Sequence, residues 1–312
     1  MIPTVLALVG GVALLAFAAD QFVLGAARVA LVKNLSPVLV GIVIIGFGTS
    51  MPELLVSALA AMRGNTEIAI GNIVGSNLAN LSLLLGVGAM MVPLAVASRT
   101  VRREGLLTVG AVGVFALVVQ GGGISRLEGF GLLLGLAVAM FAVSRRSPND
   151  PLGSETESLV VAPAHALGTE IVRTALGMLG TIGGAQLLLW GAVDLAERAG
   201  LAEGFVGVTL VAVGTSLPEL VTVIQSARRR QTDLIVGNLL GSNLFNALGV
   251  GGVVGLAAAA PVDAPALTVT GSTAALIFAV IAVVAMHTGR VVNRLEGVVL
   301  MLGYLALVPF LN

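Results

Sequence analysis

Long apolar stretches, each about the length of a membrane span, follow one another along nearly the whole chain. The mean hydropathy is +1.06, and 57% of the 312 residues are hydrophobic. A helix needs roughly 20 apolar residues to cross a bilayer. The pattern predicts ten helices, at 3–31, 37–62, 67–92, 104–121, 127–144, 169–198, 204–228, 233–259, 267–287 and 292–310.

These stretches predict an all-α polytopic membrane protein. The short alternating segments of a membrane β-barrel are missing, and 10% of the residues are charged, against about 25% in soluble domains. The longest polar stretch, 145–168, is rich in Pro, Gly, Ser and Glu and predicts a linker. We therefore expect a first half at 1–144 (helices 1 to 5) and a second half at 169–312 (helices 6 to 10).

One polar sequence occurs twice. The segment 48–53, Gly-Thr-Ser-Met-Pro-Glu, returns at 214–219 as Gly-Thr-Ser-Leu-Pro-Glu, 166 residues later (214 − 48 = 166). At the same offset, Gly-Asn-Ile-Val-Gly-Ser-Asn-Leu-Ala-Asn at 71–80 returns as Gly-Asn-Leu-Leu-Gly-Ser-Asn-Leu-Phe-Asn at 237–246. An odd number of helices in each half makes the second copy enter from the opposite side of the membrane. Such inverted repeats are typical of transporters, which bind their cargo near the midplane.

Basic residues predict the orientation. When alternate loops are assigned to one side, beginning after the first helix, that side receives every Lys and Arg except Arg63, Arg126 and Arg198. The positive-inside rule makes the basic side cytoplasmic. The linker is then cytoplasmic, and both termini lie outside, as expected for a multi-pass protein of the cell (inner) membrane.

The repeated segments place oxygen-bearing side chains at helical spacing. Residues four apart share a helix face, which pairs a hydroxyl with a carboxylate or an amide in Thr49–Glu53, Ser76–Asn80, Thr215–Glu219 and Ser242–Asn246. Carboxylate, amide and hydroxyl oxygens suit hard cations such as Ca²⁺. The chain has no Cys, and no His joins the set, which argues against zinc or copper.

Backbone irregularity is predicted at the same places. Pro52 and Pro218 each lack an N–H and disturb the preceding helical turn, where the flexible Gly48 and Gly214 lie. The remaining motif glycines, Gly71, Gly75, Gly237 and Gly241, indicate either interruptions or close packing. We therefore expect helices 2, 3, 7 and 8 to be broken.

A single copy of these features has a simpler interpretation. A lone Gly-x-x-x-Gly is usually a packing motif, and a lone Ser or Thr usually bonds its own backbone. Two membrane carboxylates within matching motifs are harder to ascribe to packing, because ionisable groups are costly in lipid. One Ca²⁺, two Na⁺ or two protons would each neutralise Glu53 and Glu219.

On these motifs the chain resembles the cation/calcium exchangers, in particular the prokaryotic sodium/calcium exchanger branch. The resemblance spans nearly the whole chain, with one of the family's alpha repeats in each half. It implies ten helices, a group of central ion sites and alternating access, in which the long helices 1 and 6 slide against the other eight.

The resemblance also implies a set of ion ligands. It places backbone carbonyls at Gly46 and Ala212, and gives Ca²⁺ contacts to Glu53 and Glu219 with Thr49 and Thr215. Flanking Na⁺ sites would use serines and the carbonyls. The full set is Gly46, Thr49, Ser50, Glu53, Ser76, Asn80, Ala212, Thr215, Ser216, Glu219, Ser242 and Asn246.

The leading hypothesis is therefore a sodium/calcium antiporter. Several relatives, including the potassium-dependent branch, carry Asp where this chain has the neutral Asn246, so we expect potassium-independent and electrogenic exchange. A calcium/proton antiporter and a cation channel are the alternatives. An enzyme is not expected, since no His-Glu-x-x-His motif or nucleophile–base pair occurs.

The expected partners are Ca²⁺, Na⁺, possible counter-transported H⁺ and membrane lipid, with no cofactor. The zero formal net charge gives no sign of nucleic-acid binding. Because one chain can supply both halves of a central site, we expect a monomer.

Overall fold

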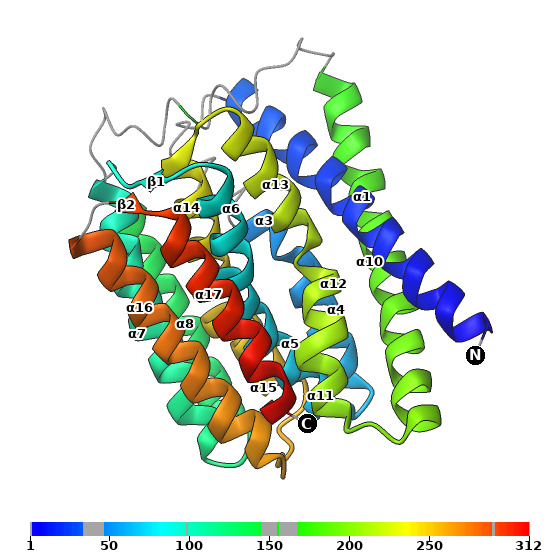
Figure 1. Ribbon diagram of the computed structural model, residues 1–312. Coiled ribbons are helices and arrows are strands. Elements are labelled where there is room, and N and C mark those ends of the chain that lie inside the picture. Colours follow the sequence, from blue (N-terminus) through cyan, green and yellow to red (C-terminus); the bar gives the residue numbers. More distant parts are fainter. Residues whose placement is uncertain are drawn as a thin grey trace.

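The computed structural model shows a bundle of helices (Figure 1) and describes residues 2–33, 47–97, 99–144, 155, 167–288 and 291–311. Apart from two short strands, the regular structure of this part of the chain is helical. The fold is thus the all-helical one that the hydropathy pattern predicts.

The first half contains helices that run alternately up and down the bundle. Its elements are α1 (Ile2–Val32), α3 (Phe47–Thr49), α4 (Met51–Met62), α5 (Thr66–Ala79), η2 (Asn80–Leu84), α6 (Leu85–Met91), strand β1 (Leu94–Ala95), α7 (Arg99–Gln120) and α8 (Arg126–Ser144).

The second half has a similar succession of helices, but its strand comes one helix later, before the last long helix. Its elements are α10 (Leu167–Ala199), α11 (Glu203–Val206), η3 (Gly207–Val211), α12 (Ala212–Thr215), α13 (Leu217–Arg228), α14 (Thr232–Phe245), η4 (Asn246–Val250), α15 (Gly251–Ala257), η5 (Ala266–Gly271), α16 (Ser272–Thr288), strand β2 (Val291–Val292), α17 (Arg294–Leu307) and η6 (Val308–Leu311).

Membrane-length helices make up most of the described chain. Seven helical stretches are long and apolar enough to cross a bilayer, and the bent stretch from Glu203 to Arg228 brings the number to eight. The predicted helix at 37–62 is represented by α3 and α4, because 34–46 lie outside the described residues. Most of the predicted linker also lies outside them; of its residues, Glu155 accepts a hydrogen bond from the Leu234 amide of α14 at 2.7 Å.

The two prolines break their helices where the sequence predicts. The first break falls at Ser50, between α3 and α4, and the second falls at Ser216, between α12 and α13. Both serines leave the helical region, with ψ near 9°. At the second break the stretch bends by 43°. Because proline cannot donate a backbone hydrogen bond, the bend is confined to the turn that precedes it.

The described residues contain four π-helical turns, η2 to η5, and two of them begin at the motif asparagines. The turn η2 starts at Asn80 and the turn η4 starts at Asn246. A π-turn inserts one extra residue into an α-helix and often marks a functional position. The spans Thr66–Met91 and Thr232–Ala257 are otherwise continuous, so the prediction that helices 3 and 8 are broken is wrong: their irregularity is a π-turn that follows the motif glycines.

The motif glycines in α5 serve close packing instead. A side chain on Gly71 would approach the carbonyl oxygen of Gly204 to 2.6 Å, and one on Gly75 would press against Val208 and Ala212. These contacts bring α5 against α11, η3 and α12 of the second half. The stretches 66–91 and 232–257 are the most enclosed membrane-length segments described, each 83% buried over its apolar window.

The long helices α1 and α10 pack on each other along one side of the bundle (Figure 1). Glycines line their contact on both helices. A Cβ on Gly11 would lie 2.6 Å from the backbone of Leu188, and one on Gly184 would lie 2.7 Å from the backbone of Leu15. The two helices therefore form one tightly packed pair.

Two loop contacts agree with the predicted alternation of sides. Strand β1 pairs antiparallel with β2, with Leu94 opposite Val292. At the other end of the bundle, Gly123 forms a bridge with Pro261. Each contact joins loops that the alternation assigns to the same side of the membrane.

A Gly75→Ala substitution tests the close packing of the two halves. The added methyl has no room against Val208 and Ala212, and overpacking of this kind costs about 1–3 kcal/mol. We expect a lower midpoint of thermal unfolding in detergent. Gly110→Ala in α7, where no atom lies within 4 Å of the new methyl, is the matched control and should leave the midpoint unchanged or raise it. Equal midpoints for both variants would contradict this packing.

Candidate cation-binding site

The broken helices bring the repeated motifs together in the interior of the protein. The predicted ligand residues from Thr49 to Asn246 all fall in the buried class, with exposed fractions of 0–2%. They come from α3, α4, α5 and η2 in the first half and from α12, α13, α14 and η4 in the second. Gly46 lies outside the described residues, so its carbonyl cannot be placed.

Each carboxylate is bound by a serine of the opposite half. The Ser216 hydroxyl donates to Oε1 of Glu53 at 2.9 Å, and the Ser50 hydroxyl donates to Oε1 of Glu219 at 3.0 Å. These serines are the residues at the helix breaks. Glu219 also accepts from Ser242 at 3.2 Å. The two halves thus hold each other's acidic residue through a crossed pair of bonds.

The threonines cross between halves in the same way. Thr215 donates to Oδ1 of Asn72 at 3.0 Å, and Thr49 donates to Oδ1 of Asn238 at 3.3 Å. Thr49 also lies 3.4 Å from the Ser242 hydroxyl. These bonds join helix pairs whose residues are far apart in sequence, and they orient the hydroxyl groups.

Several oxygens in this cluster have no hydrogen-bond partner among the described residues. Buried polar groups are normally paired, and an unpaired buried acceptor costs about 1–3 kcal/mol. Such oxygens remain free to coordinate a cation. They are Glu53 Oε2, Glu219 Oε2, Ser76 Oγ, Asn80 Oδ1 and Asn246 Oδ1, all from residues that the motifs predict.

The Ala212 carbonyl, which the resemblance gives as an ion ligand, already accepts two hydrogen bonds. Its oxygen accepts from the Ser216 amide at 3.1 Å and from the Thr215 hydroxyl at 3.1 Å. The helix therefore remains wound at Ala212, and the break begins only at Ser216. Any ion bound by this carbonyl would have to share it with those donors.

The charge of the cluster comes from two carboxylates. The described residues contain no group of three or more His, Cys, Asp or Glu side chains arranged to hold a metal. Glu219 experiences the charge of Glu53, so a cation between them would relieve both the repulsion and the cost of burying the charges. The arrangement is suited to a hard cation with mixed neutral and charged oxygen ligands.

Three asparagines belong to this cluster although the sequence analysis did not select them as ligands. Asn72 and Asn238 receive the threonine hydroxyls, and Asn243 accepts from the Asn80 amide at 3.1 Å. All three lie inside the repeated segments. Their duplication was the signal that could have identified them, whereas their bonding partners depend on how the halves meet.

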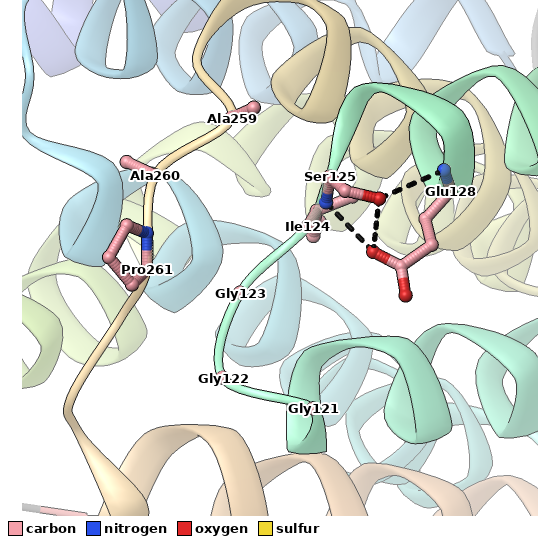
Figure 2. Close-up of a pocket in the computed structure, with 9 residues that line it drawn as sticks. All are labelled: Gly121, Gly122, Gly123, Ile124, Ser125, Glu128, Ala259, Ala260 and Pro261. Carbon is pink, nitrogen blue, oxygen red and sulfur yellow. Dashed lines mark hydrogen bonds between the residues drawn. The ribbon is translucent and has the colours of Figure 1, made fainter.

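A separate hollow lies where the loop at 121–125 meets Ala259–Pro261 (Figure 2). Its carboxylate, Glu128, turns back to accept from the amide and hydroxyl of Ser125 at 2.8 and 2.7 Å. This pattern caps the start of α8. The Glu128 carboxylate therefore stabilises the start of α8.

Fold and cluster together define the class: a helical membrane protein with a buried, oxygen-lined centre built from two sequence repeats. A family model described as "Sodium/calcium exchanger protein" matches residues 3–145 and again 169–311. The chain therefore belongs to the sodium/calcium exchanger family, whose members are ion exchangers and not enzymes.

Individual relatives match this chain over nearly its full length. The chain is 35% identical over 318 aligned residues to "Putative antiporter CaxA" of Alkalimonas amylolytica, covering 98% of this chain and 97% of the relative. It is 28% identical to "Sodium/calcium exchanger MaX1" of Methanosarcina acetivorans, with 95% of each covered. A solved structure of the sodium-calcium exchanger NCX_Mj aligns with a TM-score of 0.71 and 27% identity, covering 99% of this chain and 98% of that one.

The unequal bonding of the two carboxylates gives a prediction. Ser216→Ala removes the hydroxyl that donates to Glu53, whereas after Ser50→Ala the Glu219 oxygen still accepts from Ser242. Hydrogen bonds to charged groups contribute about 1.5–3 kcal/mol, so Ser216→Ala should weaken Ca²⁺ binding by roughly tenfold or more and Ser50→Ala by less. Calorimetric titration in detergent measures both, and an equal or reversed order would refute the difference.

Proposed function

We propose that this protein is a sodium/calcium antiporter that moves Ca²⁺ against Na⁺ by alternating access. One observation carries the proposal: two fully buried carboxylates, one from each repeat, are held by serines of the opposite repeat, among oxygens that have no hydrogen-bond partner in the part of the chain that the structure describes. Such a centre is costly without a cation, and cations of different charge can relieve the cost.

The proposed ligands follow the motifs. Glu53 and Glu219, with Thr49 and Thr215, would bind Ca²⁺ at the centre. Flanking Na⁺ ions would use Ser50 and Ser216 with the carbonyls of Gly46 and Ala212, and the remaining ligands of the set are Ser76, Asn80, Ser242 and Asn246. Hydroxyl, amide and carboxylate oxygens serve both ions, so the ions compete for one centre.

Charge sets the expected coupling. The two carboxylates supply at most two negative charges, and Asn80 and Asn246 add none. Exchange of one Ca²⁺ for more than two Na⁺ moves net charge across the membrane, so transport would be electrogenic. With an amide at Asn246, the centre does not gain a third carboxylate for K⁺, and exchange would be potassium-independent.

The proposed architecture is ten spans arranged as two inverted repeats of five, at 1–144 and 169–312, joined by a cytoplasmic linker at 145–168. The protein would be embedded in the cell (inner) membrane, with both termini on its extracytoplasmic side. The glycine-lined contact between α1 and α10 supports movement of this pair past the remaining helices, which would open the centre to each side in turn. One chain supplies both halves of the centre, so a monomer suffices.

A sodium gradient provides the direct test. Purified protein is placed in vesicles loaded with Na⁺, and uptake of radiolabelled Ca²⁺ is followed after dilution into Na⁺-free buffer. We expect uptake that depends on internal Na⁺, is unaffected by K⁺ and generates a membrane potential in the absence of a counter-ion pathway. The control is the same vesicles without a Na⁺ gradient.

The alternatives give different outcomes in this assay. Uptake driven by a pH gradient and abolished by a proton ionophore, without Na⁺ dependence, would establish calcium/proton antiport. Calcium current without any counter-ion coupling would establish a channel. Either result would overturn the sodium hypothesis.

Neutralising one carboxylate should abolish transport. Glu53→Gln and Glu219→Gln each keep the side-chain shape but remove one of the charges that a divalent cation needs, so we expect Ca²⁺ uptake to fall to background. Glu128→Gln is the matched control, because that carboxylate is exposed and caps α8. Near-normal uptake by either Glu53→Gln or Glu219→Gln would contradict the ligand assignment.

A further inference from the structure

The two asparagines that receive the threonine hydroxyls are bonded differently, although they are equivalent in the repeat. Asn72 and Asn238 are both fully enclosed, with exposed fractions of 0% and 1%. Each accepts from the threonine of the opposite half. The difference lies in what their amide nitrogens contact.

The Asn72 amide has fixed partners on both ends. Its Nδ2 donates to the Ser57 hydroxyl at 2.9 Å and to the backbone oxygen of Glu53 at 3.3 Å, while its Oδ1 accepts from Thr215. Turning the amide over would place Oδ1 against the Glu53 carbonyl oxygen, and two acceptors repel. The Ser57 hydroxyl is itself anchored, since it donates to the Ala69 carbonyl at 3.3 Å. The amide therefore has one orientation.

This orientation decides the state of the Thr215 hydroxyl. A hydroxyl has one hydrogen and two acceptor lone pairs. The Thr215 hydrogen is directed to Asn72 Oδ1 and the Ala212 carbonyl, at 3.0 and 3.1 Å. Its lone pairs are thus kept for an electron-poor partner, and Thr215 is held as an oxygen acceptor whether or not a cation is present.

In the second half the anchor is missing. The position equivalent to Ser57 is Val223 (57 + 166 = 223), which is buried and offers no oxygen. The Asn238 Nδ2 has no hydrogen-bond partner among the described residues. Turning Asn238 over would let Nδ2 donate to Thr49 and leave Oδ1 unpaired instead. Since either orientation leaves one amide atom unpaired, neither is fixed.

We propose that Ser57 and Asn72 are positioning residues that keep Thr215 as a permanent acceptor for the transported cation, whereas Val223 leaves the Asn238 amide able to turn. The cation subsites of the two halves would then differ: the Thr215 hydroxyl faces an amide of fixed orientation, and the Thr49 hydroxyl faces an amide whose orientation settles only as the ion arrives. A preformed oxygen binds more tightly because no reorientation opposes binding. This inference rests on the proposed function, in which both threonines bind the cation.

Two substitutions test the anchoring hydroxyl in each half separately. Ser57→Ala removes the hydroxyl that anchors Asn72, and Val223→Thr adds a hydroxyl at the position equivalent to Ser57 with almost no change of volume. A hydrogen bond of this type corresponds to about three- to tenfold in an equilibrium constant. We expect Ser57→Ala to weaken Ca²⁺ binding by this factor and Val223→Thr to strengthen it, each measured by calorimetric titration of the purified full-length protein.

A second readout separates positioning from simple stability. Ser57→Thr retains the hydroxyl and should restore the Ca²⁺ affinity that Ser57→Ala loses. In the absence of Ca²⁺, thermal unfolding reports the structural cost of each change. If Ser57→Ala lowers the unfolding midpoint but binds Ca²⁺ as tightly as the unmodified protein, the bond is merely structural and the inference is wrong.

The outcomes also distinguish this inference from the proposed function. If the unmodified protein binds no Ca²⁺, the proposed function fails and the inference fails with it. If it binds Ca²⁺ and both Ser57→Ala and Val223→Thr bind Ca²⁺ with the affinity of the unmodified protein, the proposed function stands. Only the difference between the halves is then refuted.

Discussion

The structure depends on the cost of placing Glu53 and Glu219 in the middle of an apolar bundle. Burial removes these groups from water, so each needs polar partners inside the protein. Part of the compensation comes from across the molecule, where Ser216 donates to Glu53 and Ser50 donates to Glu219; Ser242 of the same half also donates to Glu219. The two halves therefore need each other at their most polar point. This requirement explains why the helices break there and why the motif glycines of α5 allow the second half to approach so closely.

The same constraint gives the centre its proposed chemistry. Beside the two carboxylates lie oxygens that have no hydrogen-bond partner among the residues the structure describes, and buried polar groups are normally paired. In the proposed exchanger, a cation supplies the missing partner, and its release to one side exposes the cost again. A site of this kind favours exchange over leakage, because leaving it empty is unfavourable. In that proposal the glycine-lined α1–α10 pair, with close contacts such as Gly184 on Leu15, is the element that would move past the other helices.

Much of this architecture could be predicted from the sequence. The apolar runs predict the helices, Pro52 and Pro218 predict the two breaks next to the serines, and the repeat predicts the polar residues that lie buried together. Other features could not be predicted in the same way. The π-turns at Asn80 and Asn246 depend on how the long helices fit their neighbours, and the glycines that seemed equally able to interrupt α5 prove to serve packing.

The sequence by itself determined which groups are present: two carboxylates, neutral amides at Asn80 and Asn246, and hydroxyls at matching positions in both halves. These follow from residue identity and spacing along a single helix. The tertiary structure decided which group bonds to which. Asn72 accepts a hydrogen bond from Thr215, which is 143 residues away in sequence. Ser57 fixes the orientation of Asn72, while its counterpart Val223 has no side-chain oxygen that could fix Asn238. Such pairings arise only when the halves are packed together, because hydrogen bonds depend on distance and direction in space.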